Sequence, residues 1–347
     1  MIHPGRSRPS TAAVVVALLI VYVVWGSTYL AIAYMIETMP PLLAAGVRYA
    51  TAGGIMLAVL AARARLRTSA EPAERATAAH WRSAFIVGGL LLLGGNGGVV
   101  LSELFIPSGI AAVLVATVPI WMAVFDAVLT RRRPSGLVIG GLFAGIAGVA
   151  VLVVPVAGLK GLDLLGVGLV LGATISWAAG SIYARRAPLP RSGLLGTGME
   201  MVAGGAALII AGTLLGEIGR TDIGAFSTRS IIAVIYLVLF GSIVAFTAYT
   251  WLLAHVPVAT VATYAYVNPI VAVALGAMFL AEPITPRPLI AAAIIIGAVI
   301  AMVSGRARTA EGPGPAPEAA TLEPPDGAGS DPAARSRHGH DDPLRAD

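Results

Sequence analysis

Residues 12–36 read AAVVVALLIVYVVWGSTYLAIAYMI, a run without one charged side chain. A helix rises about 1.5 Å per residue and the hydrocarbon core of a bilayer is about 30 Å thick, so roughly 20 apolar residues span it. The run therefore predicts a transmembrane helix. A membrane strand fits poorly, because barrel strands alternate apolar and polar residues and this run is continuously apolar.

Nine further runs have a similar length and composition, separated by charged or Pro/Gly-rich segments. They extend over residues 41–62, 83–102, 107–129, 136–154, 164–183, 194–215, 230–253, 257–280 and 285–304. Because lipid offers the backbone no hydrogen-bond partner, each run has to close its own bonds as a helix. The sequence thus predicts an all-α integral membrane protein with ten transmembrane helices.

The composition of the whole chain agrees with this expectation. Of its 347 residues, 57% are hydrophobic and 12% are charged, whereas a soluble domain carries roughly 25% charged residues. The net charge of +5 does not indicate nucleic-acid binding, because the arginines fall between the apolar runs and form no face. Cysteine is absent from the sequence, which excludes disulfides, thiolate metal sites and thiol nucleophiles.

The placement of arginine predicts how the spans are oriented. If the N-terminus lies inside, fifteen arginines fall on inner segments, and the outer loops hold only Lys160, Arg220, Arg229 and Arg287. Inner loops of membrane proteins carry an excess of basic residues. We therefore expect a multi-pass protein with both termini in the cytoplasm.

The chain resembles itself at an offset of 149 to 152 residues, which indicates an internal repeat. The segment at 106–109 (IPSG) lies over 256–259 (VPVA), and the segment at 118–120 (VPI) lies over 268–270 (NPI). Each copy holds five predicted spans. Because five is odd, the second copy is expected to be inverted relative to the first, an architecture that suits alternating access to a central site.

The repeats divide the chain into four parts. We expect a cytoplasmic N-terminal segment at 1–11, a first five-helix repeat at 12–155 and a second at 161–304. After residue 304 the composition changes to Pro, Gly, Ala and mixed charge, so 305–347 is predicted to be a disordered cytoplasmic tail.

Several motifs resemble those of the EamA-type branch of the drug/metabolite transporter superfamily. They include a Trp-Gly motif at 25–29 (WGSTY), an Arg-aromatic pair at Arg48-Tyr49 and a Glu-containing close at 280–283 (LAEP). The starting and mid-helix prolines of the fourth and ninth spans fit the same pattern. The first copy departs from it at 130–133 (TRRR), where the family often has Glu.

The resemblance covers about residues 12–304 and implies a secondary transporter of the inner (plasma) membrane. It implies transport of metabolites such as amino acids, or of drugs, usually by export. Its partners would be the lipid bilayer and a small-molecule substrate, and a neutral or zwitterionic solute fits the scarcity of deep charge. A non-transporting scaffold or assembly protein is the alternative function, and a monomer and a dimer fit equally.

An enzyme is not expected. No histidine falls in the middle of a predicted span, and the HExxH motif is absent from the sequence, although catalysis needs a placed acid, base, nucleophile or metal. No cofactor, metal or nucleic acid is assigned.

Polar and aromatic residues deep in the apolar runs form the candidate substrate site. Small-molecule sites are commonly apolar cavities with a few placed polar groups. The set is Trp25, Ser27, Tyr29, Arg48, Asn96, Trp177, Tyr264, Tyr266 and Asn268. Trp and Tyr also form belts at membrane interfaces, a role that suits the deep Trp25 and Trp177 less well.

Charged groups inside a span are costly, so each is a functional hypothesis. Arg48 either holds a substrate carboxylate through its two-pronged donors or anchors helices by bonding backbone carbonyls. Glu200 is either a proton-coupling site or an inner-end acid neutralised by Arg191. Pro119 and Pro269 are predicted to kink their helices beside a central cavity.

Overall fold

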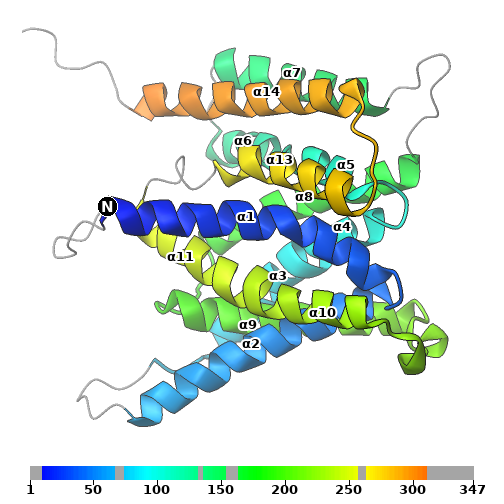
Figure 1. The fold of residues 1–347 in the computed structure, drawn as a ribbon. Coiled ribbons are helices and arrows are strands. Elements are labelled where there is room, and N and C mark those ends of the chain that lie inside the picture. Colours follow the sequence, from blue (N-terminus) through cyan, green and yellow to red (C-terminus); the bar gives the residue numbers. More distant parts are fainter. Residues whose placement is uncertain (1–9, 67–73, 132–135, 154–162, 257–262, 311–347) are drawn as a thin grey trace, which may run out of the picture. The chain divides into compact units, whose positions relative to one another are not determined.

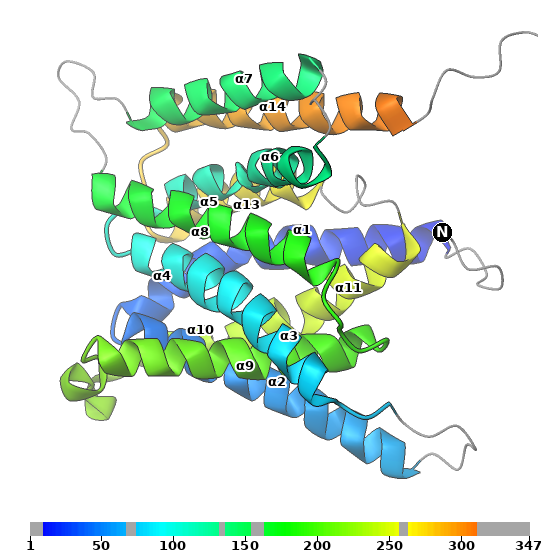
Figure 2. The same cartoon turned by 180° about the vertical axis from the view of Figure 1, so that it is seen from behind.

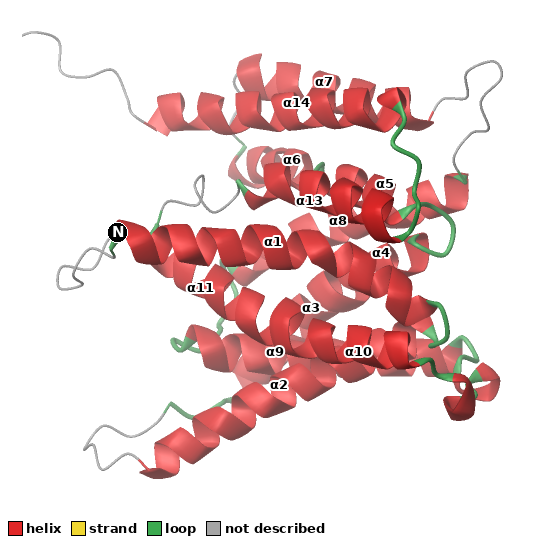
Figure 3. Cartoon of the chain, viewed as in Figure 1, coloured by secondary structure: helices red, strands yellow, loops and turns green. Residues whose placement is uncertain are grey.

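The computed structural model describes residues 10–66, 74–131, 136–153, 163–256 and 263–310. Within these ranges every regular element is a helix (Figure 3). Most of the N-terminal segment and of the predicted tail lies outside the described residues, as does the beginning of the ninth predicted span.

The helices follow one another as Figure 1 shows. In the first half of the chain they are α1 (Thr11–Ile36), α2 (Pro41–Leu66), α3 (Ala78–Gly88), η1 (Gly89–Gly97), α4 (Gly98–Ser102), α5 (Ser108–Val115), α6 (Val118–Thr130) and α7 (Gly136–Val153). In the second half they are α8 (Leu164–Ala184), α9 (Gly193–Leu214), η2 (Ile218–Arg220), η3 (Ile223–Ala225), α10 (Thr228–Tyr236), η4 (Leu237–Val244), α11 (Ala245–His255), α13 (Tyr264–Phe279) and α14 (Pro286–Ala310). Both η1 and η4 are π-helical and continue directly into the α-helices on either side.

Seven stretches of the described chain are long and apolar enough to cross a membrane. They are Thr11–Ile36, Pro41–Leu66, Ala78–Ser102, Ser108–Leu129, Leu164–Ala184, Gly193–Leu214 and Thr228–Leu252. Three shorter apolar helices, Ile139–Val151, Val267–Phe279 and Pro286–Ala298, fall within the remaining predicted runs. The described chain is therefore all-helical and suited to cross a membrane several times, and the count of ten spans stays a prediction.

The fourth predicted run is not one continuous helix. α5 ends at Val115 and α6 begins at Val118, so Pro119 stands in the first turn of α6. A proline in a first turn costs no helical hydrogen bond, because the N–H that it lacks would have no partner there. Pro119 thus follows a break in the run, whereas Pro269 lies inside α13.

Helices of the first half pair with helices of the second half. α2 packs along α9, α7 along α14 and α1 along α13 (Figures 1 and 2). Between α2 and α9 the backbones touch: a Cβ on Gly53 would lie 2.7 Å from the carbonyl oxygen of Gly198, and one on Gly205 would lie 2.5 Å from the backbone nitrogen of Ala50. Small residues allow this close approach where helices pack in membranes.

A carboxylate caps one end of each helix in the α2–α9 pair. Glu217, which follows α9, accepts from the backbone N–H groups of Leu42 (3.1 Å) and Leu43 (2.8 Å) at the beginning of α2. Glu74, which follows α2 in the chain, accepts from those of Arg191 (2.8 Å) and Ser192 (2.9 Å) just before α9. All four N–H groups would otherwise lack a partner. The hydrogen bonds from Arg191 and Ser192 hold the pKa of Glu74 below its ordinary value.

Candidate functional site

A cavity lies between the two halves of the chain, beside α1, α2, α8 and α13. It contains about 830 Å³ of space free of protein atoms, part of which is open to solvent. The lining is mostly apolar and aromatic, with a few polar residues: Trp25, Thr28, Tyr29, Ile32, Arg48, Tyr49, Gly95, Asn96, Val99, Ala112, Val115, Ala116, Val118, Ala173, Thr174, Trp177, Phe246, Tyr264, Asn268 and Pro269.

Arg48 brings a buried positive charge to this cavity. Only 2% of the residue is exposed. Its Nε donates to the hydroxyl of Ser242 in η4 at 3.0 Å, and its guanidinium carbon lies 4.4 Å from the ring centre of Tyr49. Its Nη1 has no hydrogen-bond partner among the described residues. The side chain is thus fixed by contacts with Ser242 and Tyr49 and keeps a free donor.

Asn96 brings a free acceptor to the same cavity. It lies in η1, and its Oδ1 is buried without a hydrogen-bond partner in the described part of the chain. Nearly all buried polar groups in proteins find a partner, so an unsatisfied one calls for an explanation. Two residues of the cavity lining thus carry an orphaned donor (Arg48) and an orphaned acceptor (Asn96). The pair is complementary to a ligand that has both an acceptor and a donor.

Aromatic rings cluster around Trp25 beside the cavity. Its ring centre lies 5.1 Å from that of Tyr264, 5.0 Å from that of Tyr249 and 5.2 Å from that of Phe246. These separations lie in the range that favours edge-to-face and tilted contacts between rings. The first and second halves of the chain therefore share one aromatic cluster.

Two hydrogen bonds tie the first helix of each half to the π-helical stretch of the other half. Trp25 Nε1 in α1 donates to the carbonyl of Gly241 in η4 at 3.2 Å, and Ser176 Oγ in α8 donates to the carbonyl of Leu90 in η1 at 2.7 Å. The two donors stand 151 positions apart in the sequence, and so do the two acceptors. π-Helical turns are rare and occur often at functional sites.

Asn268 connects α13 to α1. With its amide nitrogen turned towards two backbone carbonyls, it donates to that of Tyr264 at 3.2 Å and to that of Tyr22 at 3.1 Å. The amide is therefore held by the protein itself, next to Pro269. Its position makes it part of the cavity wall, with its nitrogen already bonded.

The structure brings most of the predicted site residues together. Trp25, Tyr29, Arg48, Asn96, Trp177, Tyr264 and Asn268 all line the cavity. Ser27 does not; its hydroxyl bonds the carbonyl of Val24 (2.8 Å) and the hydroxyl of Tyr236 on α10 (2.6 Å). The side chain of Tyr266 lies outside the described residues. Thr28, Tyr49 and Phe246 line the cavity but were not among the predicted residues.

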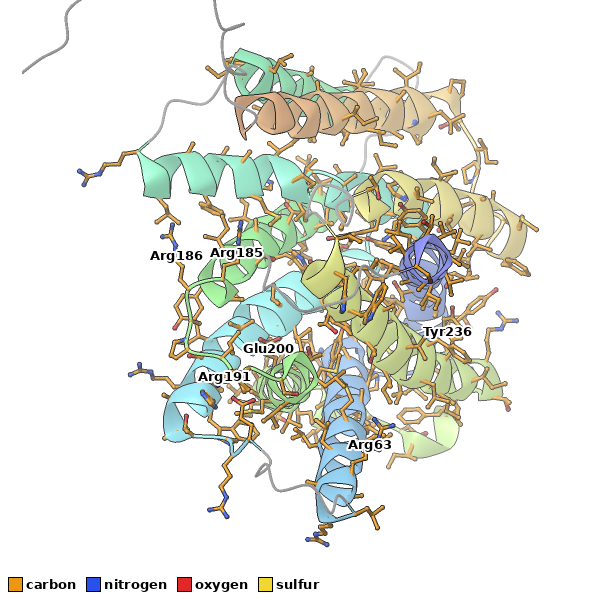
Figure 4. The ribbon with its side chains drawn as sticks, turned by 90° about the vertical axis from the view of Figure 1, so that its left-hand side faces the viewer. Arg63, Arg185, Arg186, Arg191, Glu200 and Tyr236 are labelled. Atoms are coloured by element: carbon orange, nitrogen blue, oxygen red, sulfur yellow. The ribbon has the colours of Figure 1, made fainter. Side chains whose placement is uncertain are left out.

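Glu200 lies on α9 and does not line the cavity. In Figure 4, Arg185, Arg186 and Arg191 lie to the left of it. No ion pair between Glu200 and Arg191 occurs in the described part of the chain, where the backbone of Arg191 bonds Glu74 instead. The predicted neutralisation by Arg191 is thus not seen in this conformation.

A solved crystal structure has a similar fold. It superposes with a TM-score of 0.56 over 87% of this chain and 100% of its own, at 20% sequence identity. At this identity the likeness concerns the fold alone.

Comparison with known sequences gives a membrane-transport family. The model of the EamA-like transporter family matches residues 12–154 and 164–304. An uncharacterized inner membrane transporter of Escherichia coli (strain K12), YedA, is 38% identical over 291 residues, which are 84% of this chain and 90% of that protein. A "probable amino-acid metabolite efflux pump" of the same strain is 25% identical over 298 residues, covering 84% and 94%. The chain belongs to the EamA-like transporter family.

Proposed function

We propose that the protein is a secondary transporter that exports small zwitterionic or neutral metabolites such as amino acids, or drugs, by alternating access. The observation that carries the proposal is a pair of orphaned polar atoms, Arg48 Nη1 and Asn96 Oδ1, on two residues that line an apolar cavity between the two halves. A substrate that has both an acceptor and a donor would give each of these atoms a hydrogen-bond partner.

The chemistry of the cavity favours a zwitterion with an apolar side chain. The guanidinium of Arg48 suits a carboxylate, and the amide oxygen of Asn96 suits an ammonium or another N–H donor. The rings of Trp25, Trp177 and Tyr264 offer apolar surface to a side chain. One guanidinium among the lining residues is too little positive charge for a polyanion such as a sugar phosphate.

We also propose the architecture that this function needs: ten transmembrane helices in two inverted five-helix repeats, 12–155 and 161–304, with both termini cytoplasmic. The two matches of the family model support the repeats. Each half also donates a hydrogen bond to the other at equivalent positions, from Trp25 to Gly241 and from Ser176 to Leu90, which supports the equivalence of the two repeats. The outward direction rests on one relative, whose name is "probable amino-acid metabolite efflux pump".

Transport into proteoliposomes tests the function. The purified protein is reconstituted and offered a panel of labelled amino acids, including phenylalanine, together with cationic drugs. We expect flux of at least one zwitterionic amino acid. Inertness across the whole panel would favour the scaffold and overturn the proposal.

Substitution of Arg48 tests the site. A hydrogen bond to a charged group contributes about 1.5–3 kcal/mol, so Arg48→Gln is expected to lower the affinity for the zwitterion by about 10- to 100-fold. The corresponding amine, which lacks the carboxylate, should lose much less, and this comparison separates binding from misfolding. The matched control is Arg229→Gln, an exposed residue that pairs with Glu37 at 3.3 Å, and it should leave both solutes unaffected.

A further inference from the structure

Two glutamates meet at one end of the helices, outside the apolar stretches. Glu103 follows α4 directly, and Glu282 lies in the loop between α13 and α14. The two carboxyl groups interact electrostatically. On the proposed topology both lie at the outer face. The two carboxyl groups differ in their hydrogen-bond partners.

The surroundings of Glu282 are built for a carboxylate. Its Oε1 accepts from the backbone N–H and the hydroxyl of Ser108, both at 2.8 Å, and its Oε2 accepts from the N–H of Gly109 at 3.1 Å. These groups begin α5, where the helix dipole adds positive potential. A Cβ on Gly276 would lie 2.5 Å from Oε2, so glycine leaves the room that the carboxylate occupies. Three donors at the beginning of a helix thus contact the carboxyl group of Glu282.

Glu103 has the opposite surroundings. Both of its carboxylate oxygens are buried, and neither has a hydrogen-bond partner in the described ranges. A buried, unpaired carboxylate is costly, and protonation removes that cost. Burial, and secondly the charge of Glu282, raise the pKa of Glu103 well above its ordinary value. Glu103 therefore holds a proton in this conformation.

No ion pair joins Glu103 to a cation in the described part of the chain. α1 contributes Tyr29, which lines the central cavity and interacts electrostatically with Glu103. α2 contributes Arg48 and Tyr49, which contact each other, and α8 contributes Asp163 at its N-cap, which accepts from the N–H of Leu165 and is exposed. η1 carries no titratable side chain.

We propose that Glu103 is a proton-binding site that couples the outer end of the transporter to external pH. While the segment between α4 and α5 stays packed, Glu103 keeps its proton. When that segment separates from α1 and from the loop after α13, water reaches the carboxyl group, which gives its proton to water; closure takes one up again from hydronium. The coupling to solute flux rests on the proposed transport function, whereas the proton site does not.

Thiol labelling tests the proton site without any substrate. The natural chain has no cysteine, so Ile106→Cys places a single thiol at a buried position (3% exposed) in the segment between Glu103 and α5. We expect its labelling by a membrane-impermeant maleimide to rise with pH, by at most about tenfold per pH unit for one proton. Rates are normalised to Leu104→Cys, an exposed neighbour, because thiol reactivity itself depends on pH.

The substitution Glu103→Gln decides the outcome, because an amide mimics the protonated acid. In this background the normalised labelling of Ile106→Cys is expected to stay low and independent of pH. Glu37→Gln, an exposed acid in a surface ion pair, and Glu200→Gln serve as matched controls and should keep the rise. A pH-dependent rise that persists in Glu103→Gln, or that disappears in Glu200→Gln alone, would overturn the proposal.

Flux measurements test the coupling. Labelled phenylalanine efflux from proteoliposomes should depend on the pH of the medium facing Glu103, and Glu103→Gln should remove this dependence. If the wild-type protein moves no solute, the transport function fails while labelling still decides for or against the proton site. If the wild-type protein transports and Glu103→Gln keeps the same pH profile, only the coupling fails.

Discussion

Two adjacent glycines of α2, Gly53 and Gly54, differ in how closely they approach α9, and substituting each by alanine tests how tightly the two halves of the chain pack. A Cβ on Gly53 would lie 2.7 Å from the carbonyl oxygen of Gly198, 2.8 Å from the backbone nitrogen of Val202 and 2.9 Å from the Cβ of Met201. All three atoms belong to α9, and two of them are backbone atoms that cannot rotate away. A Cβ on Gly54, by contrast, would meet no atom within 4 Å.

We therefore expect Gly53→Ala to destabilise the protein and Gly54→Ala to leave it unchanged or slightly more stable. Overpacking costs about 1–3 kcal/mol. Both variants gain the same helix propensity, about 1 kcal/mol in a soluble helix, so their difference isolates the packing cost. The gap in unfolding free energy between them should be about 1–3 kcal/mol.

Unfolding in detergent, by titration with sodium dodecyl sulfate or by heat, measures this gap. In soluble domains of 150–250 residues 1 kcal/mol shifts Tm by about 2–4 °C, so a Tm difference of several degrees between the two alanine variants is expected. Equal stability of Gly53→Ala and Gly54→Ala would refute the close backbone contact between α2 and α9.

Two further predictions concern single contacts. Glu74→Gln should make the stability of the protein less sensitive to acid. Because the pKa of Glu74 is lowered in the fold, its ionised form stabilises the fold above the ordinary pKa of about 4.3. This contribution is lost as the pH falls through the lowered pKa. The effect is small because the group is exposed, and thermal unfolding between pH 7 and pH 3 measures it, with identical profiles counting against the cap. Trp25→Phe keeps an aromatic ring but loses the hydrogen bond to Gly241, so we expect the free energy of unfolding to fall by about 0.5–1.5 kcal/mol. The control Trp81→Phe, at a partly exposed position, should lower it by less. Equal losses in the two variants would contradict a stabilising role for the bond from Trp25 to Gly241.

The sequence correctly predicted an all-helical chain, because the physics of the bilayer is visible in composition. A run such as 12–36 has few alternatives to a helix once lipid is the solvent. The break between α5 and α6 was placed less well, since Pro119 suggested a kink at its own position and the helix ends before it, at Val115.

The faces of the helices were harder to predict than their positions. α1 is apolar on all sides, so no amphipathic period tells which residues point inwards. Successive helical residues differ by about 100° in direction, and this decides that Thr28 lines the cavity while Ser27 bonds Tyr236. Glu103 gave no signal, because an acid at the edge of an apolar run is usually solvated, and only the fold shows that its oxygens are covered.

The contact between α2 and α9 sets what kind of motion the two halves can make. Sliding one helix along the other would drive Cβ atoms into main-chain atoms wherever a glycine now faces backbone, and the carboxylate of Glu217 bridges the end of α9 to the beginning of α2. We therefore expect the α2–α9 pair to pivot rather than to slide. Helices α5, α6 and α13, which also contribute to the cavity lining, lie on the other side of α1 from α2 and α9 (Figure 1), so we expect such a pivot to change the cavity on their side.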